Sequence, residues 1–502
     1  MVLVLAASCT KDLDQQPISA ATTETFYGTP SDFIQAVNAT YNSLRSYPDR
    51  LMILSEVRSD NIYPVNEVAR DHDPINNFSP GIVTHPTVND AWVTNYNGIF
   101  KANFILDKIA GNGSILTTAL ATRLSAEARF LRAMFYFDLV RYFGKVPVVD
   151  RAVSAEEANK IPRSPVTEVY ALIMADLQFA VANLPATYTG TYPAYTAADA
   201  GRATKYAAEA LLGQVYMARS GPTYGIEGPG LGLNEWGLAL PLFNDVINSG
   251  QFVFNTSFTN IFSYTNQAPT ANREAIFDVM YLSGQTPVLG ATYPWILAPQ
   301  DYFNWFANTS LANGTLGFPA VSKDLVAKYA TADVRRSPTI HTTAFSYTGI
   351  TYTQPFFRKW LDTTRIPTAS RFDWGINYIA TRYTDVLLLK AECVLRGAPG
   401  SQATDVDGVV NAVRTRAGLP AITGVTLAQL LEERRRELAN EGTRWFDLQR
   451  SGNLITIMNA WIVTEDAVLH KMNSVTANYI LYPVPQSQID AAPGLYTQNP
   501  GY

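Results

Sequence analysis

The chain has 502 residues, of which 47% are hydrophobic and 16% are charged, and its formal net charge is -5 at pH 7. These proportions exclude a disordered or fibrous protein, and the length allows one large domain or two to four smaller ones. The acidic balance argues against nucleic acid as a partner, because phosphate backbones are held by clustered basic surfaces. The two cysteines, Cys9 and Cys393, exclude a disulfide framework and a zinc site built from thiolates.

The first predicted feature is the apolar run at residues 2–7, which leads into Cys9. It is too short to span a membrane, which takes about 20 apolar residues, and it fits the end of an export signal. The letters "LAASC" resemble the lipobox of bacterial lipoproteins, in which the cysteine is lipidated. We therefore expect residues 1–9 to be the remnant of a signal peptide ending at a lipidated Cys9. The alternative is an ordinary buried N-terminal segment.

Three helices are predicted in the first third of the chain. Phe33, Val37 and Tyr41 follow the spacing of an amphipathic helix, and a second helix is predicted from about residue 92 to 109. The third, in "SAEARFLRAMFYFDLVRYFGKVPVV", is expected to begin at Ser125 and to end at Gly144. Because this third helix is apolar nearly all round, we expect it to be buried between other helices.

Later helices indicate a repeat of helical pairs. Helices that begin near residues 125, 164 and 204 are about 40 residues apart, somewhat more than the 34-residue tetratricopeptide repeat. Leu212, Gly213 and Tyr216 match part of that repeat's signature. Further helices are predicted at 382–397, 404–418 and 426–442. We therefore predict helical scaffolds at residues 10–250 and 379–502.

Two regions have the composition of loops. Residues 251–378 are rich in Gly, Pro, Thr, Asn and aromatic residues with little helical periodicity, and residues 61–89 are similar. Long loops in a compact protein are usually functional or disordered, and the aromatic content favours a function. We predict that residues 251–378 form a loop-rich insert with short strands between the two scaffolds, and that 61–89 form a ligand loop.

Several segments resemble the SusD/RagB family of outer-membrane nutrient-binding lipoproteins. They are "CTKDLDQQP", "FIQAVNATYNSL", "FLRAMFYFDLVRYFGKVPVV", "EERRRELANEGTRWFDLQRSGN" and "YPVPQSQIDAAPGLYTQNPGY", which span the chain in order. The resemblance implies one compact, mainly α domain, with a tetratricopeptide-like scaffold of helical pairs, a loop-rich inserted ligand-binding region and few short strands.

The resemblance also implies a function. Members are lipid-anchored in the outer membrane of Gram-negative bacteria, are exposed at the cell surface, and sit as lids on a SusC-like TonB-dependent transporter. The expected role is therefore capture of an oligosaccharide or polysaccharide and its delivery to that transporter. Lys11, Asp12 and Asp14 resemble the signal that sends such lipoproteins to the surface.

The C-terminal family segment carries six residues expected to form a structural cluster. One interpretation makes the charged ones ligand contacts or an acid and base pair. The other interpretation is a partly buried ion network that fixes the helix. Because buried charges need partners, the charged residues of this segment would pair with one another. We expect the network. The six residues are Arg434, Glu437, Glu441, Arg444, Trp445 and Asp447.

Candidate ligand residues are chosen by chemistry, because the family's contacts lie in variable segments. Sugar rings stack on aromatic side chains, and Tyr and Trp add a polar group. The alternative for each candidate is a packing role; Trp92 is assigned to the core, and Trp360 and Trp374 stay open. The candidates are Tyr63, Asn66, Arg70 and Asp73 in the first loop region and Trp295, Tyr302, Asn304 and Trp305 in the second.

Catalysis is not expected from the sequence. His72, His85, His341 and His470 are scattered, and neither a zinc-protease nor a serine-hydrolase motif occurs. We therefore expect no catalytic residue, no metal and no cofactor. Three alternatives to glycan capture stay open: a peptide ligand, as in the RagB branch; a protein-binding scaffold; and a glycosidase that uses two carboxylates.

Overall fold

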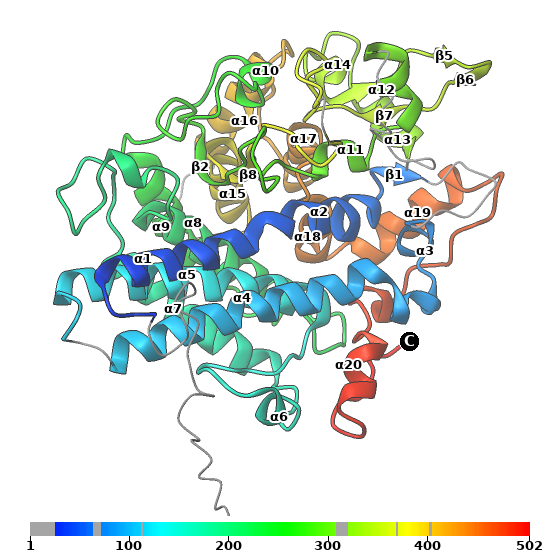
Figure 1. Ribbon diagram of the computed structural model, residues 1–502. Helices are drawn as coiled ribbons and strands as arrows, with labels where there is room; N and C mark the ends of the chain where they lie inside the picture. Colours follow the sequence, from blue (N-terminus) through cyan, green and yellow to red (C-terminus); the bar gives the residue numbers. More distant parts are fainter. Residues whose placement is uncertain (1–25, 64–71, 112–113, 308–319, 368–369, 401–403) are drawn as a thin grey trace, which may run out of the picture.

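The computed structural model describes residues 26–63, 72–111, 114–307, 320–367, 370–400 and 404–502 (Figure 1). The predicted lipidation site Cys9 and the predicted ligand residues Asn66 and Arg70 lie outside these ranges. Within them, no helix is both long enough and apolar enough to cross a membrane. Helices dominate and the strands are short, which confirms the predicted fold class.

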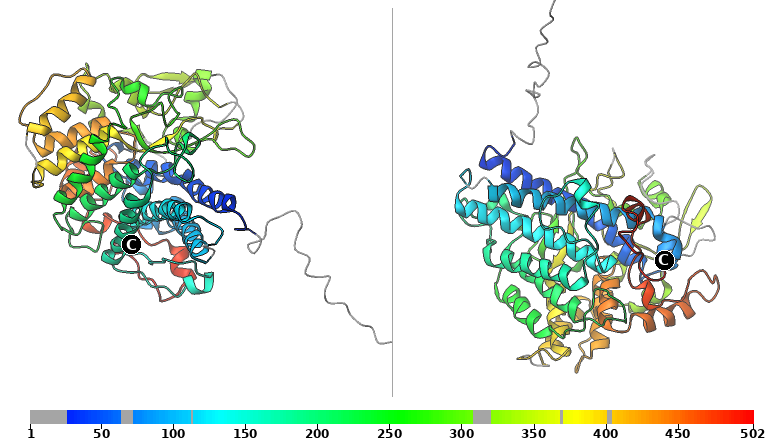
Figure 2. Two further views of the ribbon diagram at one scale, coloured as in Figure 1. Left: turned by 90° about the vertical axis from the view of Figure 1, so that its left-hand side faces the viewer. Right: turned by 90° about the horizontal axis from the view of Figure 1, so that it is seen from below.

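Long helices form one array in which successive members pack side by side (Figures 1 and 2). In this array α4 packs on α5, α5 on α7, α7 on α8, α8 on α9, and α9 on α15. The array consists of α1 (Pro30–Tyr41), α4 (Pro86–Gly111), α5 (Thr118–Phe143), α7 (Val166–Asn183), α8 (Lys205–Ser220), α9 (Trp236–Asn248), α15 (Tyr383–Leu395), α16 (Thr404–Arg416), α17 (Leu427–Leu438), α18 (Arg444–Ser451) and α19 (Leu454–Glu465).

Shorter helices connect the array or lie in the insert. Between α1 and α4 lie η1 (Asn42–Ser46), α2 (Tyr47–Leu51), η2 (Met52–Val57), α3 (Asp73–Asn76) and η3 (Pro80–Thr84). The others are α6 (Ala155–Ala158), η4 (Ala197–Asp199), α10 (Phe258–Ile261), α11 (Tyr293–Ile296), α12 (Gln300–Ala307), α13 (Lys323–Lys328), α14 (Arg336–Thr339), η5 (Ala477–Tyr479) and α20 (Gln486–Ala491).

Three predicted helix boundaries are wrong. Helix α4 begins at Pro86 rather than near residue 92. Helix α5 begins at Thr118 rather than Ser125, because the Thr117 hydroxyl accepts the backbone N–H of Leu120 at 3.3 Å and Leu120 already packs in the core. Helix α17 ends at Leu438 rather than 442, because the chain turns through left-handed backbone at Asn440 (φ 63°) and Gly442 (φ 70°).

Between α9 and α15 the chain forms the insert, which occupies the top of Figure 1. Its two ends meet in an antiparallel ladder that pairs Val279 with Tyr378 and Ala275 with Arg382. Three further two-stranded sheets pair β1 with β3, β4 with β7 and β5 with β6. The strands are β1 (Ile62–Tyr63), β2 (Ala275–Val279), β3 (Ala320–Val321), β4 (Ile340–His341), β5 (Phe345–Tyr347), β6 (Ile350–Tyr352), β7 (Phe356–Phe357) and β8 (Tyr378–Arg382).

One hydrophobic core joins the insert to the helical array. Tyr293, Trp360 and Tyr378 pack with ring centroids 5.3–5.4 Å apart, and Trp374 is fully buried. Trp92 is 4% exposed, which confirms its assignment to the core. Because insert and array share this core, the loops of the insert lie on a rigid support.

Candidate functional site

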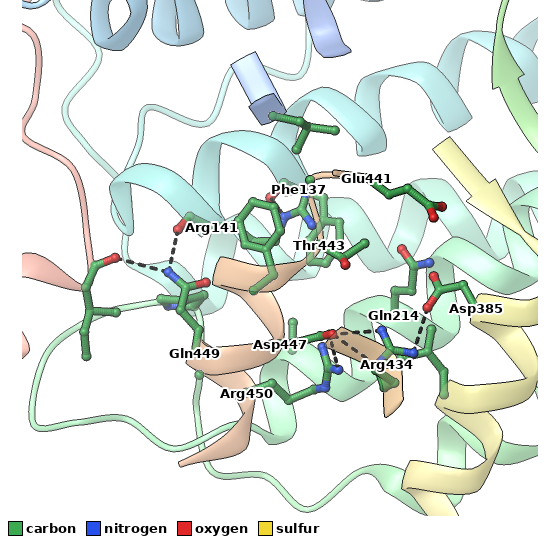
Figure 3. Close-up of a pocket in the computed structure, with 18 of the residues that line it drawn as sticks. Phe137, Arg141, Gln214, Asp385, Arg434, Glu441, Thr443, Asp447, Gln449 and Arg450 are labelled. Atoms are coloured by element: carbon green, nitrogen blue, oxygen red, sulfur yellow. Dashed lines mark hydrogen bonds and ion pairs between the residues drawn. The ribbon is translucent and has the colours of Figure 1, made fainter. Parts of the chain in front are cut away.

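A cavity lies inside the helical array, walled by α5, α8, α15 and the segment from α17 to α18 (Figure 3). Arg434 lines it and donates from Nη1 to Asp385 at 2.8 Å and from Nε and Nη2 to Asp447 at 3.1 and 3.0 Å. Arg450 donates to Asp447 at 2.6 Å. Because these charges compensate one another within the wall, the cavity is better explained as part of the scaffold than as a ligand site.

Glu437 lies among three buried arginines. Its carboxylate is 2.6 Å from Arg416, 2.9 Å from Arg382 and 3.0 Å from Arg335. Burial alone would raise the pKa of Glu437, but the three guanidinium groups hold it well below its usual range. The carboxylate is therefore ionised and joins α17 to α16, to β8 and to the segment before α14.

The predicted ion network is present, but most of its predicted partners are wrong. Arg434 pairs with Asp385 and Asp447, of which only Asp447 belongs to the family segment. Glu441 lies beyond the end of α17 and pairs with Lys359 at 2.8 Å and with Arg382 at 2.7 Å. Asp447 and the distant Asp385, and not Glu437 or Glu441, are therefore the partners of Arg434.

Arg444 and Trp445 tie α18 to the segment that follows η2. Arg444 donates from Nε and Nη2 to the two carboxylate oxygens of Asp60, each at 2.8 Å. Burial would raise the pKa of Asp60, but Arg435 and Arg444 lower it to about 2. Trp445 is fully buried, and the guanidinium carbon of Arg58 lies over the Trp445 ring, 5.5 Å from the ring centroid.

Helix α12 presents an aromatic group at the surface of the insert. Trp305 is 44% exposed, and its ring centroid is 5.2 Å from Phe345 and 6.0 Å from Tyr302. Phe345 stacks in turn on Tyr352, 4.8 Å away with the ring planes 7° apart. We call Tyr302, Trp305, Phe345 and Tyr352 the Trp305 cluster.

A second aromatic group surrounds α11. Trp295 is half-buried, and its ring lies 5.6 Å from that of Phe372, which is 40% exposed. The guanidinium carbon of Arg371 is 4.8 Å from each ring centroid. We call these three residues the Trp295 cluster. Phe303 on α12 packs 5.6 Å from Tyr302 and 5.5 Å from Trp374. Nε1 of Trp374 donates to the carbonyl of Arg371 at 3.0 Å, so the two buried rings connect the clusters.

Hydrogen bonds hold α11 in place from two sides. Ala291 and Trp374 exchange backbone hydrogen bonds of 2.8 and 3.2 Å, which fix the segment that carries Arg371 and Phe372. Thr292 donates its hydroxyl to Asp49 on α2 at 2.5 Å. Burial raises the pKa of Asp49 to about 7, although Thr292 and two arginines oppose that rise.

The predicted ligand residues of the insert occupy different depths. Trp305 is exposed, Trp295 and Asn304 are half-buried, and Tyr302 is only 2% exposed. Tyr302 therefore supports Trp305 from below and presents almost no ring surface to solvent.

The predicted ligand residues of the first loop region are buried where the structure describes them. Tyr63 is 4% exposed, and its hydroxyl donates to Asp466 at 2.5 Å. Asp73 is 5% exposed at the start of α3. Tyr63 is therefore a packing residue in this structure, because its ring is covered by the core.

Phe372, Arg371 and Tyr352 are not among the predicted ligand residues. The signal available was the run "SRFDWG" near the end of the insert, where an arginine alternates with aromatic residues in a loop. In the described part of the chain, no group of three or more His, Cys, Asp or Glu side chains is placed to hold a metal ion.

Comparison with protein families gives two matches. The model of the SusD family matches residues 340–502, and a second SusD-like model, described as starch-binding and associating with the outer membrane, matches residues 13–217. The chain is 27% identical to SusD-like protein P2 of Formosa agariphila, over 100% of this chain and 98% of that protein. It is 25% identical to starch-binding protein SusD of Bacteroides thetaiotaomicron, over 80% of this chain and 76% of that protein.

Solved structures share the fold. Surface glycan-binding protein A from Bacteroides uniformis superposes with a TM-score of 0.76 at 24% identity, over 94% of this chain and 100% of that chain. Surface glycan-binding protein A from Bacteroides thetaiotaomicron, in complex with laminarihexaose, superposes with a TM-score of 0.75 at 24% identity, over the same shares of the two chains.

Proposed function

Since the chain belongs to the SusD/RagB family, we propose that it is a cell-surface glycan-binding lipoprotein. In this proposal it is lipid-anchored to the outer membrane through Cys9, captures an oligosaccharide and delivers it to a SusC-like TonB-dependent transporter. Relatives named as starch-binding and glycan-binding proteins support a saccharide as the ligand class. Because those names describe binding, we also propose that the ligand is passed on without chemical change.

The observation that carries the proposal is the pair of aromatic clusters on the insert. Trp305 and Phe372 expose 44% and 40% of their surfaces, although aromatic rings of this size are normally well covered. An exposed ring offers a flat apolar surface to the C–H face of a sugar at a low cost in side-chain entropy. The buried rings of Tyr302 and Phe345 hold Trp305 in position, and the half-buried Trp295 packs against Phe372, so the ligand surface is preorganised.

Binding to a panel of polysaccharides by affinity electrophoresis tests this function. The protein without residues 1–9 should be retarded by one glycan class. Trp305→Ala and Trp295→Ala should each weaken that binding about tenfold or more, because truncation of a central tryptophan typically costs 2 kcal/mol or more.

The matched control is Phe100→Ala, which removes a ring that is 46% exposed on α4, outside the insert. It should leave glycan binding unchanged. Proteolysed peptides serve as competitors: binding to peptides with no retardation by any glycan would replace glycan capture with peptide capture. Retardation that neither tryptophan variant alters would keep the function and move the site away from the two clusters.

A further inference from the structure

A surface pocket lies beside the Trp305 cluster, where α14 leads into β4. It has a volume of about 400 Å³, within the range of small-ligand sites. The lining residues that matter are polar: Arg336, Ser337, His341, Thr342, Thr343 and Arg358. None of these six is among the predicted ligand residues.

Strand pairing brings the two arginines of this pocket together. β4 and β7 are antiparallel, with His341 opposite Phe356. At the end of this ladder, the backbone N–H of Arg358 donates to the carbonyl of Thr339 at 2.9 Å. Arg336 begins the short helix α14 that ends at Thr339. Both arginines therefore reach the pocket from adjoining backbone segments.

Neither arginine has a counter-charge within the described residues. Arg336 and Arg358 are half-buried and form no ion pair there, and Nε of Arg336 is buried without a hydrogen-bond acceptor. The neighbouring Arg335, by contrast, pairs with Asp333 at 2.7 Å and with Glu437 at 3.0 Å. A half-buried guanidinium that lacks a carboxylate partner keeps its donors available to an anionic ligand.

Asp333 is the one carboxylate among the described lining residues, and its charge is already compensated. Its Oδ1 accepts the backbone N–H and Nε of Arg335 at 3.0 and 2.9 Å, and its Oδ2 accepts Nη2 of Arg335 at 2.7 Å. Asp333 is 3% exposed. The pocket therefore presents positive charge and hydroxyl groups to solvent.

His341 connects this pocket to the Trp305 cluster. Its ring lies 5.1 Å from Tyr302 and 4.7 Å from Phe356. Its Nε2 is buried without a hydrogen-bond partner among the described residues. A ligand that bridges the cluster and the pocket would therefore pass beside the His341 ring.

We propose that this pocket binds an anionic substituent of the captured saccharide, a sulfate ester or a uronate carboxylate, while the sugar rings lie on the Trp305 cluster. Guanidinium groups donate paired hydrogen bonds in a geometry that matches planar and tetrahedral oxyanions, and the hydroxyls of Ser337, Thr342 and Thr343 add further donors. This inference rests on the proposed function and narrows its substrate class to acidic glycans.

Affinity electrophoresis with chemically matched pairs tests the inference. κ-Carrageenan carries sulfate esters and is compared with its desulfated form; polygalacturonate carries carboxylates and is compared with its methyl ester; dextran and laminarin are the neutral arm. We expect retardation by one acidic polymer that exceeds retardation by its neutral counterpart. The double variant R336Q/R358Q should weaken that binding at least about tenfold, because each charge-assisted hydrogen bond is strong.

The control for net charge is R151Q/K160Q. Arg151 and Lys160 flank α6, and their side chains are 60% and 68% exposed. Helix α6 lies at the opposite end of the molecule from α14 (Figure 1). This control should retain acidic-glycan binding, and thermal unfolding should show that both double variants fold.

The outcomes separate the two proposals. Retardation by neutral polymers alone, unchanged in R336Q/R358Q, would overturn the anionic ligand and leave glycan capture standing. Acidic-polymer binding that survives in R336Q/R358Q, or that falls equally in R151Q/K160Q, would also overturn the pocket. Retardation by no polymer in the wider panel would overturn both proposals. The polymer pair in which the acidic form is retarded more than its neutral form identifies the bound group as a sulfate ester or a carboxylate.

Discussion

At the scale of single residues, Glu437 is a position where one substitution would disturb three buried ion pairs. One carboxylate compensates three buried guanidinium groups, which come from α16, from β8 and from the segment before α14. A buried ion pair adds little net stability when it replaces apolar packing, but removal of one partner leaves an unpaired buried charge. The family segment is therefore better explained by structure than by ligand contact.

Glu437→Gln should lower the free energy of unfolding by about 3 to 5 kcal/mol at pH 7, because three buried arginines each lose one of their carboxylate partners. Denaturant unfolding followed by circular dichroism measures this. Since the folded state depresses the pKa of Glu437, its stabilisation is present above the ordinary glutamate pKa of about 4.3 and is lost as pH falls below it. The difference in free energy of unfolding between wild type and variant should accordingly become smaller below about pH 4.

Glu432→Gln is the control on the same helix. Glu432 is 36% exposed and lies 3.5 Å from Lys328, so its loss should cost less than about 1 kcal/mol. An equal loss of unfolding free energy in the two variants would contradict the structural role of the Glu437 ion pairs.

At the scale of elements, the close approach of neighbouring helices depends on small residues. The glycine of the repeat signature, Gly213 on α8, faces Phe243 on α9, and a Cβ at that position would lie 2.5 Å from the Phe243 ring. Phe243 is fully buried, so the ring has no open space into which to move. The partial tetratricopeptide signature therefore reports a packing requirement between successive helices.

Gly213→Ala should destabilise the protein by about 1 to 3 kcal/mol, the usual cost of overpacking a core. Gly408→Ala on α16 is the matched control, because nothing lies within 4 Å of its added Cβ. There the better helix propensity of alanine should stabilise by about 0.5 to 1 kcal/mol. Opposite signs in denaturant unfolding are expected. A gain in stability at both sites would mean that helix propensity, not packing, controls the effect.

At the scale of the whole molecule, the insert and the helical array are joined by one core. The β2–β8 ladder closes the insert next to α15, and the Tyr293, Trp360 and Tyr378 rings continue into the same buried cluster as the array. A surface supported in this way changes little on ligand binding. Both proposals for the insert depend on this rigidity.

Hydrogen exchange with mass spectrometry across a denaturant series tests whether the two parts unfold together. Backbone amides of β8 and of α5 should show the same denaturant dependence, because domains that share one core unfold cooperatively. Exchange in β8 at a much lower denaturant concentration than in α5 would show that the insert opens independently. The exposed α6 segment serves as an internal reference for local fraying.

Sequence by itself determined the mainly α class, the position of most long helices and the aromatic richness of the insert, because periodicity and composition are local properties. It also selected Trp305 and Trp295, which remain predicted ligand residues. Tertiary structure alone decided that Tyr63 and Tyr302 are buried, that Arg434 pairs with Asp385, and that Arg336 and Arg358 meet in one pocket. These facts depend on contacts between residues far apart in the chain, for which a single sequence carries no local signal.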